Sequence, residues 1–116
     1  MKNPEAIHVP GIRPEVGITS VSVENAKTLT SEVGKPALIV LSKDGKEYIT
    51  TAYWGELSVK KPIYKRYSFR FTGFSFGYAG EGPNALLNYL KALGVKVDIS
   101  KLARIQDKEL PFTFEV

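Results

Sequence analysis

A glycine-rich turn that leads directly into a short amphipathic helix constrains the fold of this chain more than any other feature. The turn covers Gly77–Gly82, and Pro83 follows it at a place where a first-turn proline loses no hydrogen bond. Four leucines then recur at helical spacing and form one apolar stripe: Leu86, Leu87, Leu90 and Leu93. Gly94 stands where a left-handed C-terminal cap is expected. We therefore predict a helix over Pro83–Leu93 whose leucines pack on a core.

Strand signals surround this helix. The unbroken apolar run Ala37–Leu41 is typical of a strand covered on both faces. Asp44-Gly45 predicts a tight hairpin turn, which leads into a second strand over Lys46–Trp54. Alternating aromatic and polar residues over Tyr67–Thr72 predict a third strand.

Weaker signals fill in the rest of the chain. They predict short strands over Ile18–Glu24, Val95–Ile99 and Phe112–Val116, a polar connection over Asn25–Lys35 with room for one helical turn, and one or two helical turns over Ser100–Asp107. The expected fold class is α+β, a mainly antiparallel sheet of about four to six strands with the Pro83–Leu93 helix packed on it.

Composition places the chain among ordinary globular proteins. It has 116 residues, of which 43% are hydrophobic and 24% charged, which suits one domain. Residues Met1–Gly17 are rich in proline and glycine and are interpreted as an extended arm, followed by a single α+β domain over residues 18–116. The longest apolar run is far shorter than the roughly 20 residues of a transmembrane helix. With no cysteine and no signal-peptide pattern, a cytoplasmic protein without membrane contact is expected.

The net charge of +4 is concentrated in one central stretch. Between Leu57 and Gly80 there are five basic residues and no acidic one: Lys60, Lys61, Lys65, Arg66 and Arg70. Of the sixteen Lys and Arg residues, eleven therefore lie elsewhere, against twelve acidic residues. Localised charge of one sign indicates a surface that meets a partner.

Aromatic residues are interleaved with these cations. Single-stranded nucleic acid is bound by cations on its phosphates and by rings that stack on its bases. A candidate nucleic-acid-binding strip follows, made of Lys60, Lys61, Lys65, Arg66, Tyr67 and Arg70. In the alternative interpretation Tyr67, Phe69 and Phe71 face the core, and the cations form only a solvated face. Charge alone would still support weak, salt-sensitive phosphate binding.

The glycine turn also has two interpretations. The first turn of a helix leaves backbone N–H groups unpaired and favours an anion, so the turn is a candidate site for a phosphorylated ligand, with Gly77, Tyr78, Gly80, Gly82 and Asn84 as its residues. In the alternative, the glycines only permit a sharp reversal and close helix–sheet packing. Packing is favoured, because Pro83 removes one donor and Glu81 places a negative charge where the anion would lie.

The segment Gly73–Leu90 reads GFSFGYAGEGPNALLNYL. It resembles a family of small uncharacterised domains of phages and other mobile elements, whose core reads G-F-x-W-G-Y-G-G-S-G-P-x-x-L-x-x-x-L. The agreeing positions are Gly73, Phe74, Gly77, Tyr78, Gly80, Gly82, Pro83, Leu86 and Leu90, and the departures are Phe76, Ala79 and Glu81. The resemblance implies a related fold and a viral or mobile-element origin, and it implies no activity.

Residues that would carry catalysis are sparse. His8 is the only histidine and lies in the arm, where it is poorly placed as a general base. The spacing of the carboxylates predicts neither a metal site nor an acid–base pair, so enzymatic activity, a metal and a cofactor are not expected. The leading hypothesis is a non-enzymatic binder of nucleic acid or a nucleotide through the basic–aromatic strip. The alternative is a structural or protein-interaction module, such as a homo-oligomer, with no nucleic-acid role.

Overall fold

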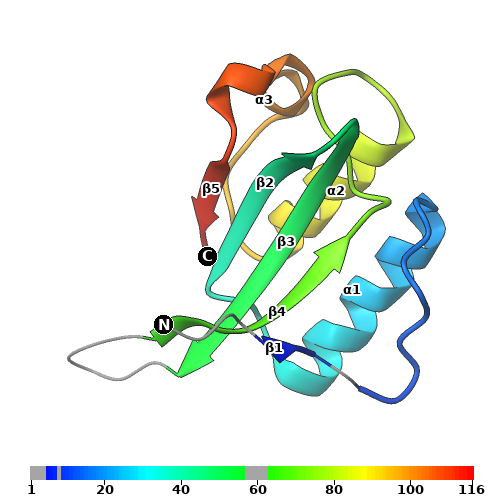
Figure 1. Ribbon diagram of the computed structural model, residues 1–116, viewed down its shortest axis with the longest axis vertical. Helices are drawn as coiled ribbons and strands as arrows, with labels where there is room; N and C mark the ends of the chain where they lie inside the picture. Colours follow the sequence, from blue (N-terminus) through cyan, green and yellow to red (C-terminus); the bar gives the residue numbers. More distant parts are fainter. Residues whose placement is uncertain (1–4, 8, 57–62) are drawn as a thin grey trace.

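The computed structural model describes residues 5–7, 9–56 and 63–116, with the backbone alone for 5, 6, 56 and 63–66. In chain order the elements are β1 Glu5–Ala6, α1 Thr19–Val33, β2 Leu38–Asp44, β3 Glu47–Glu56, β4 Ile63–Phe71, α2 Glu81–Ala92, α3 Ile99–Arg104, the short 3₁₀ turn η1 Asp107–Glu109 and β5 Phe112–Glu115. The strands form one sheet in the order β1-β4-β3-β2-β5, and α1 and α2 cover the same face of it (Figure 1). In the described part of the chain, no helix is long and apolar enough to cross a membrane.

The sheet confirms the predicted α+β class. Strands β2 to β5 pair antiparallel, and only β1 runs parallel to its neighbour β4. The hairpin joins β2 to β3 one residue later than predicted, since Asp44 pairs with Glu47 and the turn is Gly45-Lys46. Gly45 has φ 61°, the positive φ that tight hairpin turns require. In β2 burial alternates: Ile39 and Leu41 lie in the core, whereas their neighbours are half-buried, so the strand is not covered equally on both faces.

The helix α2 confirms the main sequence prediction, although it begins at Glu81 and ends at Ala92. Pro83 lies in its first turn, and Gly94 has φ 86° beyond its last turn. The N–H of Gly94 donates to the Lys91 carbonyl at 3.0 Å, and that of Val95 donates to Leu90 at 2.9 Å, which is the cap expected of a left-handed glycine. The buried leucines of α2 pack on the aromatic residues Phe71, Phe74 and Phe76.

The prediction for the segment before β2 is wrong. Residues Thr19–Val33 form the fifteen-residue helix α1, where a strand over Ile18–Glu24 and a polar connection over Asn25–Lys35 were expected. The buried positions of α1 do recur at helical spacing: Val21, Ser22, Asn25, Ala26 and Leu29. Because two of these side chains are polar, the buried face does not stand out as an apolar stripe in the sequence.

The prediction of a strand over Val95–Ile99 is also wrong. Val95, Val97 and Ile99 do pack alternately against the core, but this segment pairs with no strand and Ile99 already begins α3. The helical turns predicted over Ser100–Asp107 correspond to α3, whose N-cap Asp98 accepts a hydrogen bond from the Lys101 N–H at 2.9 Å. The terminal strand predicted over Phe112–Val116 is β5.

Candidate functional site

The predicted nucleic-acid-binding strip follows β4 and the segment before it. Lys60 and Lys61 fall outside the described residues, as do the side chains of Lys65 and Arg66. The two described members of the strip are Tyr67, which is half-buried, and Arg70, which is exposed. The burial of these two side chains agrees with the alternation of aromatic and polar residues that the sequence predicts over Tyr67–Thr72.

The described aromatic rings of β4, those of Tyr67, Phe69 and Phe71, belong to the core. Phe71 is fully buried, and Tyr67 and Phe69 pack against the same hydrophobic cluster. The ring centres of Phe69 and Phe71 are 4.9 Å apart, and those of Phe71 and Phe74 are 4.8 Å apart. The side chains that were candidates for stacking on bases thus stabilise the fold, as the alternative interpretation expected.

Arg70 lies on the opposite face of the sheet, which the helices leave uncovered (Figure 1). Its Nη2 is 3.1 Å from Oδ2 of Asp44, and the two side chains are 56% and 72% exposed. An ion pair this exposed contributes at most about 1 kcal/mol. A phosphate group can therefore compete with Asp44 for the guanidinium.

Side chains within and beside the glycine turn Gly77–Gly82 hold its conformation. The hydroxyls of Ser75 and Tyr78 are 2.6 Å apart, and the Asn84 amide donates to the Gly80 carbonyl at 2.7 Å. A Cβ on Gly80 would lie 2.9 Å from the Tyr78 ring, and one on Gly82 would overlap the Ser75 hydroxyl. Close packing therefore accounts for these two glycines.

At Gly77 the backbone conformation, rather than close packing, requires glycine. Its φ is 83°, and its N–H donates to the Leu102 carbonyl at 2.8 Å, which joins the turn to α3. Three residues of the candidate anion site thus have structural roles: Gly77, Gly80 and Gly82. Binding of an anion at the turn stays a prediction.

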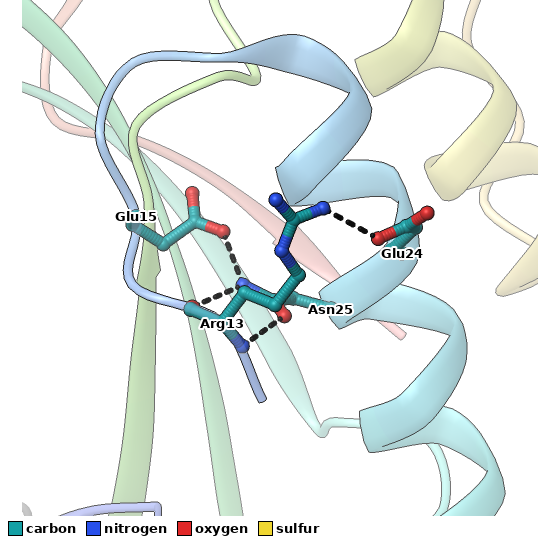
Figure 2. Close-up of polar contacts among 4 residues, drawn as sticks. All are labelled: Arg13, Glu15, Glu24 and Asn25. Atoms are coloured by element: carbon teal, nitrogen blue, oxygen red, sulfur yellow. Dashed lines mark hydrogen bonds and ion pairs between the residues drawn. The ribbon is translucent and has the colours of Figure 1, made fainter. Parts of the chain in front are cut away.

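The structure adds a polar cluster that sequence reasoning missed, which we call the arm junction: Arg13, Glu15, Ser22, Asn25, Thr72 and Gly73. Figure 2 shows its centre, where the side chain of Asn25 lies between Arg13 and Glu15. The Arg13 N–H donates to Asn25 Oδ1 at 2.9 Å, and Asn25 Nδ2 donates to the Arg13 carbonyl at 2.8 Å and to Glu15 Oε2 at 2.7 Å. The side-chain amide of Asn25 therefore pairs with the backbone N–H and carbonyl of Arg13, as a residue of a neighbouring strand would.

The carboxylate of Glu15 joins the arm to the end of β4. Its Oε1 accepts hydrogen bonds from the Ser22 hydroxyl at 2.5 Å and from the Thr72 N–H at 2.8 Å. The Ser22 hydroxyl accepts in turn from the Gly73 N–H at 2.9 Å. Ser22 and Asn25 are 0% and 1% exposed, whereas Glu15 and Thr72 are half-buried and Arg13 is exposed, so the arm junction is a paired network that is buried on the side of α1. Its signal in the sequence is two polar residues at helical spacing on the buried face of α1.

A second polar cluster ties the β2–β3 hairpin to η1. Lys43 Nζ is 2.6 Å from Asp107 Oδ2, and the Tyr48 hydroxyl donates to Asp107 Oδ1 at 2.8 Å. The hydrogen bond from Lys43, followed by that from Tyr48, lowers the pKa of Asp107 below its ordinary value. Among the described residues no group of three or more His, Asp or Glu side chains could hold a metal ion. The contacts of these two clusters position the arm, the hairpin and η1.

In comparisons with known proteins, no family model, no curated protein and no solved structure matches this chain.

Proposed function

We propose that this protein is a non-enzymatic binder of single-stranded nucleic acid, and that it contacts the phosphate backbone through the basic strip Lys60–Arg70. The observation that carries the proposal is the charge distribution: residues 57–80 hold five Lys or Arg and no Asp or Glu, while the remainder is close to neutral. The proposal includes a viral or mobile-element origin, which rests on the resemblance of Gly73–Leu90, and a cytoplasmic location.

The position of Arg70 supports contact with phosphate. Its side chain is exposed on the sheet face that no helix covers, and its exposed partner Asp44 holds it weakly. Since Tyr67, Phe69 and Phe71 pack on the core, base stacking by these rings is not part of the proposal. Binding through phosphates alone tolerates any base sequence and weakens steeply with salt, because each contact releases counterions.

The test is fluorescence anisotropy with a labelled single-stranded oligonucleotide, measured from about 50 to about 200 mM salt. We expect a triple variant, Lys65→Ala, Arg66→Ala and Arg70→Ala, to weaken binding. If each cation makes one phosphate contact, the slope of log affinity against log salt falls by about 2, at roughly 0.7 for each contact with a single strand.

A second triple variant controls for net charge. Lys91→Ala, Lys96→Ala and Lys108→Ala also remove three positive charges, from exposed positions outside the strip. We expect this variant to keep most of the affinity and the salt slope of the parent protein. Equal losses in the two triple variants, or no binding by the parent protein at low salt, would refute the proposal.

A further inference from the structure

A pocket of about 490 Å³ opens where the arm, the start of β3 and the glycine turn meet, and we call it the acidic pocket. Its lining includes Glu15 and Val16 from the arm, Glu47 from β3, and Ser75 and Tyr78 beside the turn. Among the described residues that line it, two are Glu and none is Lys, Arg or His. The pocket therefore favours a positively charged occupant and repels a phosphate group.

Neither carboxylate of the acidic pocket is neutralised by a cation. Glu15 accepts hydrogen bonds from a hydroxyl, a side-chain amide and a backbone N–H, all of them neutral donors. Glu47 is the first residue of β3, is exposed, and forms no ion pair with a described residue. Because the Glu15 carboxylate is held by the arm junction, Glu47 is the group that can pair directly with an occupant, and Glu15 adds its charge to the pocket wall.

Exposed apolar side chains gather at the same pocket. In the described part of the chain, five large hydrophobic side chains are strongly exposed. Val16 and Tyr78 line the pocket and are 64% and 48% exposed, and Ile18 is 50% exposed and lies between two lining residues in the chain. Apolar side chains that are grouped on the surface, rather than scattered, indicate contact with a partner. The partner should combine apolar side chains with positive charge.

The chain itself contains a segment of this composition. Residues 57–66 read LSVKKPIYKR, with four cations, no acidic residue and apolar residues between them. This segment overlaps the basic strip. Its charge is opposite to that of the acidic pocket, and its apolar residues match the exposed Val16 and Tyr78.

Within one molecule the segment cannot reach the pocket. Glu47 and Glu56 are the two ends of β3, which has ten residues, and at about 3.3 Å per residue they lie roughly 30 Å apart. Glu56 pairs with Ile63, so the six residues between them start and finish at the far end of β3 and can extend from it by no more than about 12 Å. A contact between pocket and segment therefore joins two copies of the chain.

We propose that the acidic pocket of one copy binds residues 57–66 of a second copy. Glu47 pairs with a lysine of this segment, and Val16 and Tyr78 contact its apolar residues. After the first contact each pair still has one free pocket and one free segment, so the association is heterologous and generates rings or open chains. The contact requires the charge of the basic strip, whether or not the strip also binds nucleic acid.

Sedimentation velocity over a range of protein concentrations tests the association. At about 50 mM salt we expect the weight-average mass of the parent protein to rise with concentration, and at about 500 mM salt we expect it to fall toward the monomer, because salt screens exposed ion pairs. A parent protein that stays monomeric at low salt would overturn the proposal.

Two variants each disable one half of the contact. Glu47→Lys reverses the charge of the pocket and keeps the segment, whereas Lys60→Ala with Lys61→Ala weakens the segment and keeps the pocket. We expect each variant to be monomeric alone. Mixed in equal amounts they should form a dimer of one copy of each that grows no further, because each pair contains one intact pocket and one intact segment. A mixture that stays monomeric, or a variant that associates alone as the parent does, contradicts the proposal.

Matched controls separate the pocket from net charge. Glu32→Lys changes the net charge as Glu47→Lys does, at an exposed position of α1 outside the pocket, and should associate like the parent protein. Lys91→Ala with Lys96→Ala is the corresponding control for the segment, since both lysines are exposed and lie outside it. Equal losses in controls and test variants would reduce the association to net charge and overturn the proposal.

Val16→Ser tests the apolar part of the contact. Val16 is exposed, so the substitution leaves the core intact, and loss of its burial against a partner should weaken the association about fivefold. Thermal denaturation should give the same melting temperature for this variant and the parent protein. An association unchanged by Val16→Ser would place the contact away from the acidic pocket and refute the proposal.

Discussion

The helix α1 borders two regions that differ in whether their buried polar side chains form hydrogen bonds. At the arm junction, the Asn25 side chain makes three hydrogen bonds and the Ser22 hydroxyl makes two. At the groove between α1 and α2, the buried Tyr89 hydroxyl makes none with the described residues. A paired polar network admits one arrangement of the chains that it joins. An unpaired buried hydroxyl costs stability, and the packing of its ring has to offset that cost.

The two regions also differ in how closely the neighbouring backbone segments approach each other. At the arm junction, Gly73 lies so near the start of α1 that a Cβ would overlap the Ile18 carbonyl and the Ser22 hydroxyl. At the groove, by contrast, α1 and α2 stay far enough apart to leave about 570 Å³ between them. The junction therefore fixes the arm against α1, whereas the groove separates α1 from α2. Substitutions on the two sides of α1 test this division.

The largest effect is expected from Asn25→Ala. The change removes three hydrogen bonds of the buried Asn25 side chain and leaves partly buried groups of Arg13 and Glu15 without these partners, so we expect a loss of about 2 kcal/mol in the free energy of unfolding. Thermal denaturation followed by circular dichroism should show a melting temperature lower by roughly 10 °C. Asn88→Ala, at an exposed position of α2, is the control and should change little. A comparable drop in both variants would mean that the junction does not fix the arm.

The second substitution, Tyr89→Phe, should not lower the free energy of unfolding as Asn25→Ala does. Removing an unpaired buried hydroxyl while keeping the ring should leave the free energy of unfolding unchanged or raise it by up to about 1 kcal/mol. Tyr48→Phe is the matched control, because the Tyr48 hydroxyl donates to Asp107, and it should lower the melting temperature slightly. Chemical denaturation of both variants measures the difference. A clear destabilisation by Tyr89→Phe would show that its hydroxyl has a partner, and the contrast between the two regions would fail.

The sequence predicts some elements of this fold and not others, for a physical reason. The helix α2, its glycine turn and the β2–β3 hairpin follow from local signals: a leucine stripe, Pro83, Gly94 and Gly45. These residues act on their own backbone or on near neighbours. The alternation in β4 likewise predicts two faces, although it does not say which one is buried.

The helix α1 and its two surfaces could not be predicted in this way. Its buried face includes Ser22 and Asn25, whose partners are 51 residues away at Gly73 and 12 away at Arg13. Propensity and periodicity carry no information about such distant pairing. The groove depends on the distance between two helices that are separated in sequence by the three strands β2, β3 and β4, and so only the structure reveals it.

The smallest effect is expected at the rim of the arm junction, where Arg13 Nη1 is 3.0 Å from Glu24 Oε2 (Figure 2). The two side chains are 59% and 62% exposed, so water screens the pair and Glu24→Gln should change the free energy of unfolding by no more than about 0.5 kcal/mol. A double-mutant cycle with Arg13→Gln isolates the coupling, which should shrink further in high salt. A coupling above about 1 kcal/mol would mean that surface charge shares in fixing the arm. In that case the contrast with the groove would rest on charge as well as on the buried hydrogen bonds of Asn25.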